Sequence, residues 1–304
     1  MVLVVFAVLS LTAGLVGFLS VGRWPAADPA LSASVSVGAE LRSRPRPRTF
    51  LRSRLDPAAA TGLVLTLALI GFVVAGAVTG LFAWMIRADR GVVSVDLAVE
   101  RWADVHATAL TDGVLGAFTH LGDTETVVGV AIAVGLFGLW RWRRPGIPLF
   151  LLSVLLGQLL ISNTIKEVID RARPALRPRA EFTGTSFPSG HTTAATATYL
   201  AVALVLAIGT SPRARAALAG VALAIGVAVG CTRVLLGVHF FSDAVAGFAI
   251  GLSWFGLCAV AFGGRLLRFG TPAKVAAVPV VRTDLSQRRR MVMPSDRGVR
   301  KERR

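Results

Sequence analysis

The chain has 304 residues, of which 54% are hydrophobic, and its formal net charge of +16 comes mostly from arginine. A mean hydropathy of +0.66 is too apolar for an ordinary soluble domain, and long uncharged runs predict a membrane protein. Basic residues beside membrane segments favour contact with anionic lipid, so nucleic acid is not expected as a partner. Cys231 and Cys258 lie in apolar sequence without metal-ligand spacing, and we expect them to be buried packing residues.

The N-terminal part of the chain divides into two segments of opposite character. Residues 1–22 are apolar almost throughout and lack the basic start of a secretory signal, so we expect an extra spanning helix. An uncleaved anchor and a start assigned too early are the alternatives. Residues 23–61 are rich in proline, alanine, serine and arginine without apolar periodicity, which predicts a disordered basic linker.

Six further apolar segments predict an all-α, polytopic membrane fold with a six-helix transmembrane core over residues 62–263. Each approaches the roughly 20 residues that cross a bilayer. They lie at 62–86, 124–140, 146–165, 191–209, 214–232 and 243–263. Between the first two, the acidic stretch 87–123 contains an amphipathic portion, Val95–Ala117, which predicts one or two helices lying on the membrane surface.

Loop charge predicts how these segments are oriented. The linker before residue 62, the loops around Arg143 and Arg213, and the tail 264–304 are basic, and all fall on one side if the six segments alternate. The positive-inside rule places that side in the cytoplasm. The acidic stretch 87–123 and the loops that join the third to the fourth and the fifth to the sixth core segment are then expected together on the extracytoplasmic side.

The first chemistry-bearing cluster stands at the end of the third core segment. Lys166 lies where that helix emerges, and Arg173 follows before Pro174. An ammonium group and a planar guanidinium fork both match phosphate oxygens. Ordinary snorkelling of long basic side chains to the interface is the alternative, and for Lys166 alone it stays open.

A second cluster, Pro188-Ser189-Gly190-His191, directly precedes an apolar helix. Ser189 is suited to cap that helix, and Gly190 lets backbone N–H groups approach an anion at its positive end. His191 falls in the first turn, at the membrane–water boundary. The alternative is a simple helix cap with an unrelated histidine.

The third cluster surrounds a short turn that contains Gly237. Arg233 and His239 flank the turn, and Asp243 follows His239 by four residues, which predicts that both face the same side of a helix. A carboxylate bonded to one ring nitrogen fixes the tautomer and leaves the other nitrogen free as nucleophile or base. Alternatively, Asp243 only caps the helix, a role that Ser242 fits equally well.

Together and in this order, the clusters resemble the type 2 phosphatidic acid phosphatase superfamily. The family pattern is Lys-x6-Arg-Pro, then Pro-Ser-Gly-His, then Ser-Arg-x5-His-x3-Asp. This chain matches it from Lys166 to Asp243, except that Thr232 replaces the serine and keeps a hydroxyl group. The six-segment layout extends the resemblance to residues 62–263.

The resemblance implies a role for each residue. His239 would attack phosphorus and form a phosphohistidine, Asp243 would orient it, and His191 would protonate the leaving oxygen. The phosphoryl oxygens would be held by Lys166, Arg173, Ser189, Gly190 and Arg233. Because cationic side chains would do the work of Mg²⁺, no metal ion or other cofactor is expected. His106 and His120 match no motif and are expected to be surface residues.

The leading interpretation is an integral membrane lipid phosphatase acting at the outer face on undecaprenyl diphosphate, phosphatidic acid or phosphatidylglycerol phosphate. Its partners would be the lipid phosphate substrate and membrane lipids, with anionic lipid at the basic linker and tail; the oligomeric state is open. A lipid-phosphate binding protein or transporter is the alternative, but anion binding alone needs no oriented pair of histidines. A vanadate-using haloperoxidase, soluble and with the same phosphate pocket, is disfavoured by six spanning segments.

Overall fold

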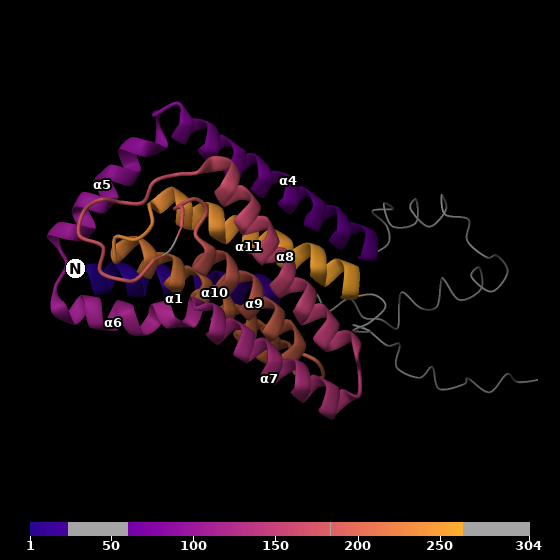
Figure 1. Ribbon diagram of the computed structural model, residues 1–304. Helices are drawn as coiled ribbons and strands as arrows, with labels where there is room; N and C mark the ends of the chain where they lie inside the picture. Colours follow the sequence, from indigo (N-terminus) through magenta and orange to yellow (C-terminus); the bar gives the residue numbers. More distant parts are fainter. Residues whose placement is uncertain (24–59, 183, 264–304) are drawn as a thin grey trace, which may run out of the picture.

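The computed structural model describes residues 1–23, 60–182 and 184–263, and the regular structure in these ranges is entirely helical (Figure 1). The predicted linker and the tail 264–304 lie almost wholly outside the described residues. The helices are α1 (Val2–Arg23), α4 (Ala60–Arg87), α5 (Val92–Val105), α6 (Ala109–Thr119), α7 (Thr124–Trp142), α8 (Gly146–Ile169), α9 (Gly190–Leu206), α10 (Pro212–Leu235) and α11 (Phe241–Gly263), with a 3₁₀ turn, η1 (His120–Gly122).

Among the described residues, six helices are long and apolar enough to cross a membrane: α1, α4, α7, α8, α10 and α11. The prediction of an all-helical, multi-pass membrane fold is therefore confirmed. Helix α9, the fourth predicted core segment, has 17 residues and is about 26 Å long, at the lower end of the length that crosses a bilayer. It ends earlier than predicted because the chain turns at Gly209, whose φ of 76° is left-handed.

Helix α9 lies at the centre of the bundle. It packs against α7, α8, α10 and α11, and 13 of its 17 residues are buried. Alanines and threonines fill this helix, so its neighbours approach closely. A Cβ atom on Gly251 of α11, for example, would lie 2.7 Å from the backbone oxygen of Thr193. The helix that begins at the Pro-Ser-Gly-His motif is thus held from several sides.

The expected extra N-terminal helix is α1, and it packs along α10. Glycines line the contact: a Cβ atom on Gly220 would lie 2.6 Å from the backbone oxygen of Gly14, so only glycine fits there. Small residues give transmembrane helices this close approach. Val2 and Phe6 are buried against Leu115 of α6 and other residues, which places the N-terminus at the end of the bundle where α5 and α6 lie (Figure 1).

The stretch between α4 and α7 forms two helices, as its amphipathic pattern predicts. Thr108 begins α6 with a capping box formed with Thr111. Helix α5 turns its acidic residues inward, so that Asp96 and Glu100 are buried, while Val105 at the end of α5 and Leu110 on α6 are 78% and 71% exposed. Acids facing the protein and aliphatic side chains facing outward suit helices that lie in a membrane interface.

The loops carrying the sequence motifs meet at this same end of the bundle, as loop charge predicts. The α8–α9 loop reaches the α10–α11 turn through a hydrogen bond of 2.9 Å from the backbone nitrogen of Arg179 to the oxygen of Leu236. The Arg179 side chain also pairs with Asp104 of α5 at 3.1 Å. Helices α5 and α6 therefore cover and anchor the loops (Figure 1).

Candidate phosphate-binding and catalytic site

His239 and Asp243 form a buried pair at the α10–α11 turn, with side chains 2% and 0% exposed. Because α11 begins at Phe241, His239 lies in the preceding turn, and the prediction that both residues share a helical face is wrong in that detail. The carboxylate instead reaches back: its Oδ2 lies 3.4 Å from Nδ1 of His239 and accepts the backbone N–H of Phe240 at 2.9 Å. The Ser186 hydroxyl donates to the same oxygen.

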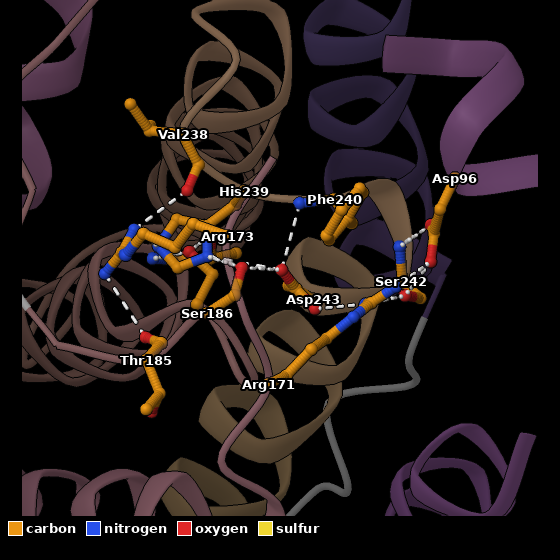
Figure 2. Close-up of polar contacts among 12 residues, drawn as sticks. Asp96, Arg171, Arg173, Thr185, Ser186, Val238, His239, Phe240, Ser242 and Asp243 are labelled. Carbon is orange, nitrogen blue, oxygen red and sulfur yellow. Dashed lines mark hydrogen bonds and ion pairs between the residues drawn. The ribbon is translucent and has the colours of Figure 1, made fainter. Parts of the chain in front are cut away.

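The other edge of the His239 ring faces Arg173, as Figure 2 shows. Nη1 of Arg173 lies 3.2 Å from Nε2 of His239. The guanidinium is held by backbone oxygens of Val238 at 2.8 Å, Gly184 at 2.9 Å and Thr185 at 3.2 Å. Since the Nδ1 side faces a carboxylate and the Nε2 side faces an N–H donor, the geometry favours the tautomer with its proton on Nδ1.

The charge state of His239 follows from its surroundings. Burial lowers the pKa of His239 to about 4, and although Asp243 opposes this shift, Arg173 and Arg233 reinforce it. At neutral pH the imidazole is therefore uncharged, and its lone pair lies on Nε2, where it faces the N–H of Arg173.

His191 has a carboxylate partner of its own, which no sequence motif indicated. It lies in the first turn of α9, and its Nε2 is 3.0 Å from Oδ1 of Asp123, in the loop before α7. The second oxygen of Asp123 lies 2.7 Å from Nδ1 of His120. Burial alone would raise the pKa of Asp123, but the hydrogen bonds to the two histidines outweigh it and lower the pKa. His120 is exposed, as expected, yet it belongs to this cluster.

Ser189 caps α9, as the sequence predicts: its Oγ accepts the backbone N–H of Thr192 at 3.5 Å and the Thr192 hydroxyl at 2.8 Å. Gly190 is the first helical residue, so the N–H groups of the first turn stand at the positive end of the helix. A Cβ atom on Gly190 would lie 3.6 Å from Nζ of Lys166. The Lys166 ammonium therefore lies beside this helix start.

The three cations come from three elements: Lys166 from the last turn of α8, Arg173 from the α8–α9 loop, and Arg233 from the last turn of α10. Arg233 bonds Thr119 Oγ1 at 3.1 Å and the oxygen of Glu181 at 3.2 Å. Its buried Nε has no hydrogen-bond partner among the described residues. A phosphate oxygen would satisfy that donor, and three neighbouring cations favour an anion among them.

Among the described residues, the two cysteines and His106 take no part in the hydrogen bonds of the site. Cys258 is buried and Cys231 is half-buried. His106 stacks on Trp102 and contacts its backbone oxygen at 2.8 Å, away from the site. Within the described ranges, no group of three or more His, Cys, Asp or Glu side chains is arranged to hold a metal ion.

No sequence pattern singled out three charged residues at the site: Asp96, Asp123 and Arg171. Arg171 lies between Lys166 and Arg173 and carried only the signal of a third cation in that stretch. The two acids lie in the 87–123 stretch, where an alternating charge pattern gives no reason to single them out.

Comparison with known proteins identifies the same core. The model of the PAP2 superfamily matches residues 147–266. Phosphatidylglycerophosphatase B of Bacillus subtilis (strain 168) is 32% identical over 185 residues, which cover 59% of this chain and 89% of the relative. Lipid A 1-phosphatase of Rhizobium johnstonii is 39% identical over 108 residues, which cover 32% of this chain and 40% of that protein.

A solved structure agrees with the fold. The crystal structure of a transmembrane PAP2 type phosphatidylglycerolphosphate phosphatase from Bacillus subtilis superposes with a TM-score of 0.58 at 29% identity, covering 63% of this chain and 97% of that one. With relatives that are named phosphatases and six apolar helices, this protein is a multi-pass membrane phosphoric ester hydrolase. The chain belongs to the PAP2 superfamily.

Proposed function

We propose that this phosphatase hydrolyses a lipid phosphomonoester or an isoprenoid diphosphate through a phosphohistidine on His239. The orientation of the His239 ring carries the proposal: Nδ1 faces Asp243, and Nε2 faces Arg173 at 3.2 Å. An imidazole held in this way presents a lone pair to an anion bound by the neighbouring cations. A group that only binds phosphate needs no such tautomer.

In the first step, Nε2 of His239 forms a bond to phosphorus while the bond from phosphorus to the leaving oxygen breaks. The departing oxygen takes the electron pair and a proton from His191, and Asp243 stabilises the positive charge that forms on the His239 ring. In the second step, His191 removes a proton from water, the water oxygen attacks phosphorus, and inorganic phosphate leaves as the bond to Nε2 breaks.

The phosphoryl oxygens would be held by Lys166, Arg173, Arg233 and the helix start at Ser189 and Gly190. These groups supply positive charge that is fixed before the substrate arrives, which is the main way that enzymes stabilise a transferring phosphoryl group. Arg233 has a buried Nε donor without a partner among the described residues, and this supports its assignment.

Asp123 extends this assignment. It contacts His191 at 3.0 Å through the same nitrogen that would protonate the leaving oxygen. A carboxylate in this position stabilises the imidazolium form before transfer, and the leaving oxygen then competes for the same proton. Burial and the positive charge of Arg233 lower the pKa of His191 to about 4, and Asp123 opposes that shift. Asp123 would therefore increase the share of His191 that carries the proton, and a bound phosphate anion would increase it further, without Asp123 itself touching phosphorus.

Hydrolysis of a panel of lipid phosphates by the purified protein is the experiment that tests the proposal. Purified protein should release phosphate from phosphatidylglycerol phosphate, which the name of the 32% identical relative favours, or from phosphatidic acid or undecaprenyl diphosphate. Label from ³²P-substrate should be trapped on the protein as an acid-labile, base-stable adduct that is lost in His239→Ala.

Turnover should also survive excess EDTA, because side chains supply the positive charge. Activity that disappears with EDTA and returns only with Mg²⁺ would contradict the metal-free mechanism. The absence of any trapped adduct during turnover would contradict the phosphohistidine.

The active site is proposed to face the extracytoplasmic side, since loop charge puts the basic segments in the cytoplasm. The chain has two cysteines, so a variant with Cys231 and Cys258 replaced by alanine provides a clean background. A cysteine at Glu181 should react with an impermeant maleimide in intact cells, and a cysteine at Ser295 should react only after lysis. The reverse pattern would invert the topology.

A further inference from the structure

Arg171 stands between two buried carboxylates. Its Nη1 lies 2.6 Å from Oδ1 of Asp243, and its Nη2 lies 2.8 Å from Oδ2 of Asp96. The side chains of Arg171, Asp96 and Asp243 are 7%, 1% and 0% exposed, so little water screens these charges. Phe240 covers the guanidinium, with its ring centre 4.0 Å from Cζ.

Asp96 also holds the start of α11 from outside that helix. Its Oδ1 accepts the backbone N–H of Ser242 at 2.8 Å, and its Oδ2 accepts the Ser242 hydroxyl at 2.6 Å. The Ser242 oxygen in turn accepts Nη1 of Arg171 at 2.8 Å. A carboxylate at a helix N-terminus is favoured by unpaired N–H groups and by the helix dipole. Helix α5 thus caps the helix that carries Asp243 (Figure 2).

Arg171 fixes the opposite side of Asp243 from the nucleophile. With Oδ1 bonded to Arg171, Oδ2 is the oxygen that faces Nδ1 of His239 and the Ser186 hydroxyl. The backbone oxygen of Arg171 also accepts the N–H of Ser186 at 2.8 Å. One residue therefore sets the position of two groups that contact the Nδ1 edge of the imidazole.

The charges in this cluster do not balance until the reaction begins. One guanidinium lies between two carboxylates, and His239 beside them is uncharged in the resting protein. When Nε2 attacks phosphorus, the ring gains positive charge directly against Asp243. If Arg171 paired with Asp243 alone, its charge would offset that of the carboxylate; because Asp96 shares Arg171, Asp243 keeps more of its negative potential for the ring.

We propose that Asp96 and Arg171 are positioning residues for the nucleophile: together they fix Asp243 and preserve its support of the charged His239 ring. The inference rests on the proposed role of His239 as nucleophile. It gives the amphipathic helix α5 a part in the chemistry through the contacts of Asp96 with Arg171 and Ser242.

The test compares Asp96→Asn with Glu100→Gln. Both acids lie on the inner face of α5, but Glu100 bonds the backbone N–H of Leu176 at 3.0 Å and stays outside the Arg171 cluster. In the full-length protein, Asp96→Asn should reduce the rate of phosphoenzyme formation and kcat by about 10- to 100-fold with little change in KM, as loss of an outer partner does. Glu100→Gln should keep kcat within about threefold of the wild type.

A pH profile separates positioning from simple loss of structure. His239 is faced by Asp243 from α11, by Arg173 from the α8–α9 loop, by Arg233 from α10 and by His191 from α9. Arg171→Gln removes a positive charge from the cluster, so the ring should be protonated more easily. The acid limb of kcat/KM for one nitrophenyl substrate should then move up by about one pH unit.

Arg171→Lys keeps the positive charge, so the acid limb of kcat/KM should stay at the pH of the wild type. Asp96→Asn/Arg171→Gln removes one charge of each sign and should bring the limb back toward that of the wild type. An acid limb that is the same in all of these variants, or equal losses of kcat in Asp96→Asn and Glu100→Gln, would overturn the inference. If Arg171→Gln does not fold, the matched pair on α5 decides the question alone.

Phosphoenzyme trapping on the wild type keeps the two proposals apart. If the wild type forms no adduct, the phosphohistidine mechanism fails. If the wild type forms the adduct and Asp96→Asn forms it equally fast, only the positioning role fails.

Discussion

The two histidine–aspartate pairs differ most in their access to water. The side chains of His239 and Asp243 are 2% and 0% exposed, whereas those of His191 and Asp123 are 30% and 28% exposed. A nucleophile must keep one tautomer and one direction, which a dry, crowded site ensures. A group that gives up a proton in one step and regains it in the next needs a route to solvent.

The hydrogen-bond partners of Asp243 and Asp123 support the same distinction between the two pairs. Asp243 is bonded by donors from the chain around it, including Arg171, Ser186 and the backbone of Phe240. Asp123 contacts two histidines, and the side chain of one, His120, is 72% exposed. The first carboxylate is bonded from several sides, while the second links His191 to the exposed His120. The pairs thus share residue types but suit different tasks.

Breaking the buried pair should have the largest effect. His239→Ala removes the atom that is proposed to bond to phosphorus, so turnover should fall by at least about 10⁴-fold with every substrate. His106→Ala is the matched control, because His106 stacks on Trp102 away from both pairs and should keep near-normal activity. Phosphate release from a monophosphate, a diphosphate and nitrophenyl phosphate gives the measurement. Residual turnover in His239→Ala with any of them contradicts its role as nucleophile.

Removing the imidazole of the half-buried His191–Asp123 pair should have an effect that depends on the leaving group. A lipid alkoxide is a poor leaving group and needs a proton, so His191→Ala should slow monophosphate hydrolysis by about 10²- to 10⁴-fold. Nitrophenolate leaves more easily, and the loss with nitrophenyl phosphate should be clearly smaller, with diphosphates in between. The ratio of kcat/KM losses is the quantity to compare. Equal losses with all three substrates would reject the general-acid role.

Removing only the carboxylate of the His191–Asp123 pair should have the smallest effect. Asp123→Asn keeps the shape but loses the charge that stabilises protonated His191, so monophosphate turnover should fall by about 3- to 10-fold. Since His191 would lose its proton more readily, the alkaline limb of the pH profile should move to lower pH.

Asp89 is exposed in the turn after α4 and offers a matched control. Asp89→Asn should change neither the rate nor the alkaline limb of the pH profile. A wild-type alkaline limb in Asp123→Asn would show that Asp123 does not hold the proton of His191.

Much of this arrangement could be predicted from the sequence because it is encoded locally. Hydrophobic runs indicate membrane helices, and a polar cluster at the end of each run indicates where side chains leave the apolar region. The positions of Lys166, Arg233 and His239 near helix ends follow from this pattern. The short length of α9 was missed, because an apolar run does not reveal that the helix stops before Gly209.

The supporting residues were not predictable for a different reason. Asp96 and Arg171 are 75 positions apart, and the contact between Asp123 and His191 spans 68 positions. Such contacts depend on how α5 and the α6–α7 connection fold over the loops, and a single sequence carries no local pattern for that. The acids of 87–123 were predicted as the charge of a surface segment, yet Asp96 and Glu100 face the protein.

The outward aliphatic faces of α5 and α6 have a consequence for how the enzyme meets its substrate. With Val105 and Leu110 in the membrane interface, the proposed phosphate site would lie at headgroup level, and a lipid substrate would reach it without leaving its leaflet. Encounters then occur by lateral diffusion in two dimensions. We therefore expect the rate to follow the mole fraction of substrate in the bilayer or micelle, so that adding inert lipid slows turnover while the bulk concentration stays constant.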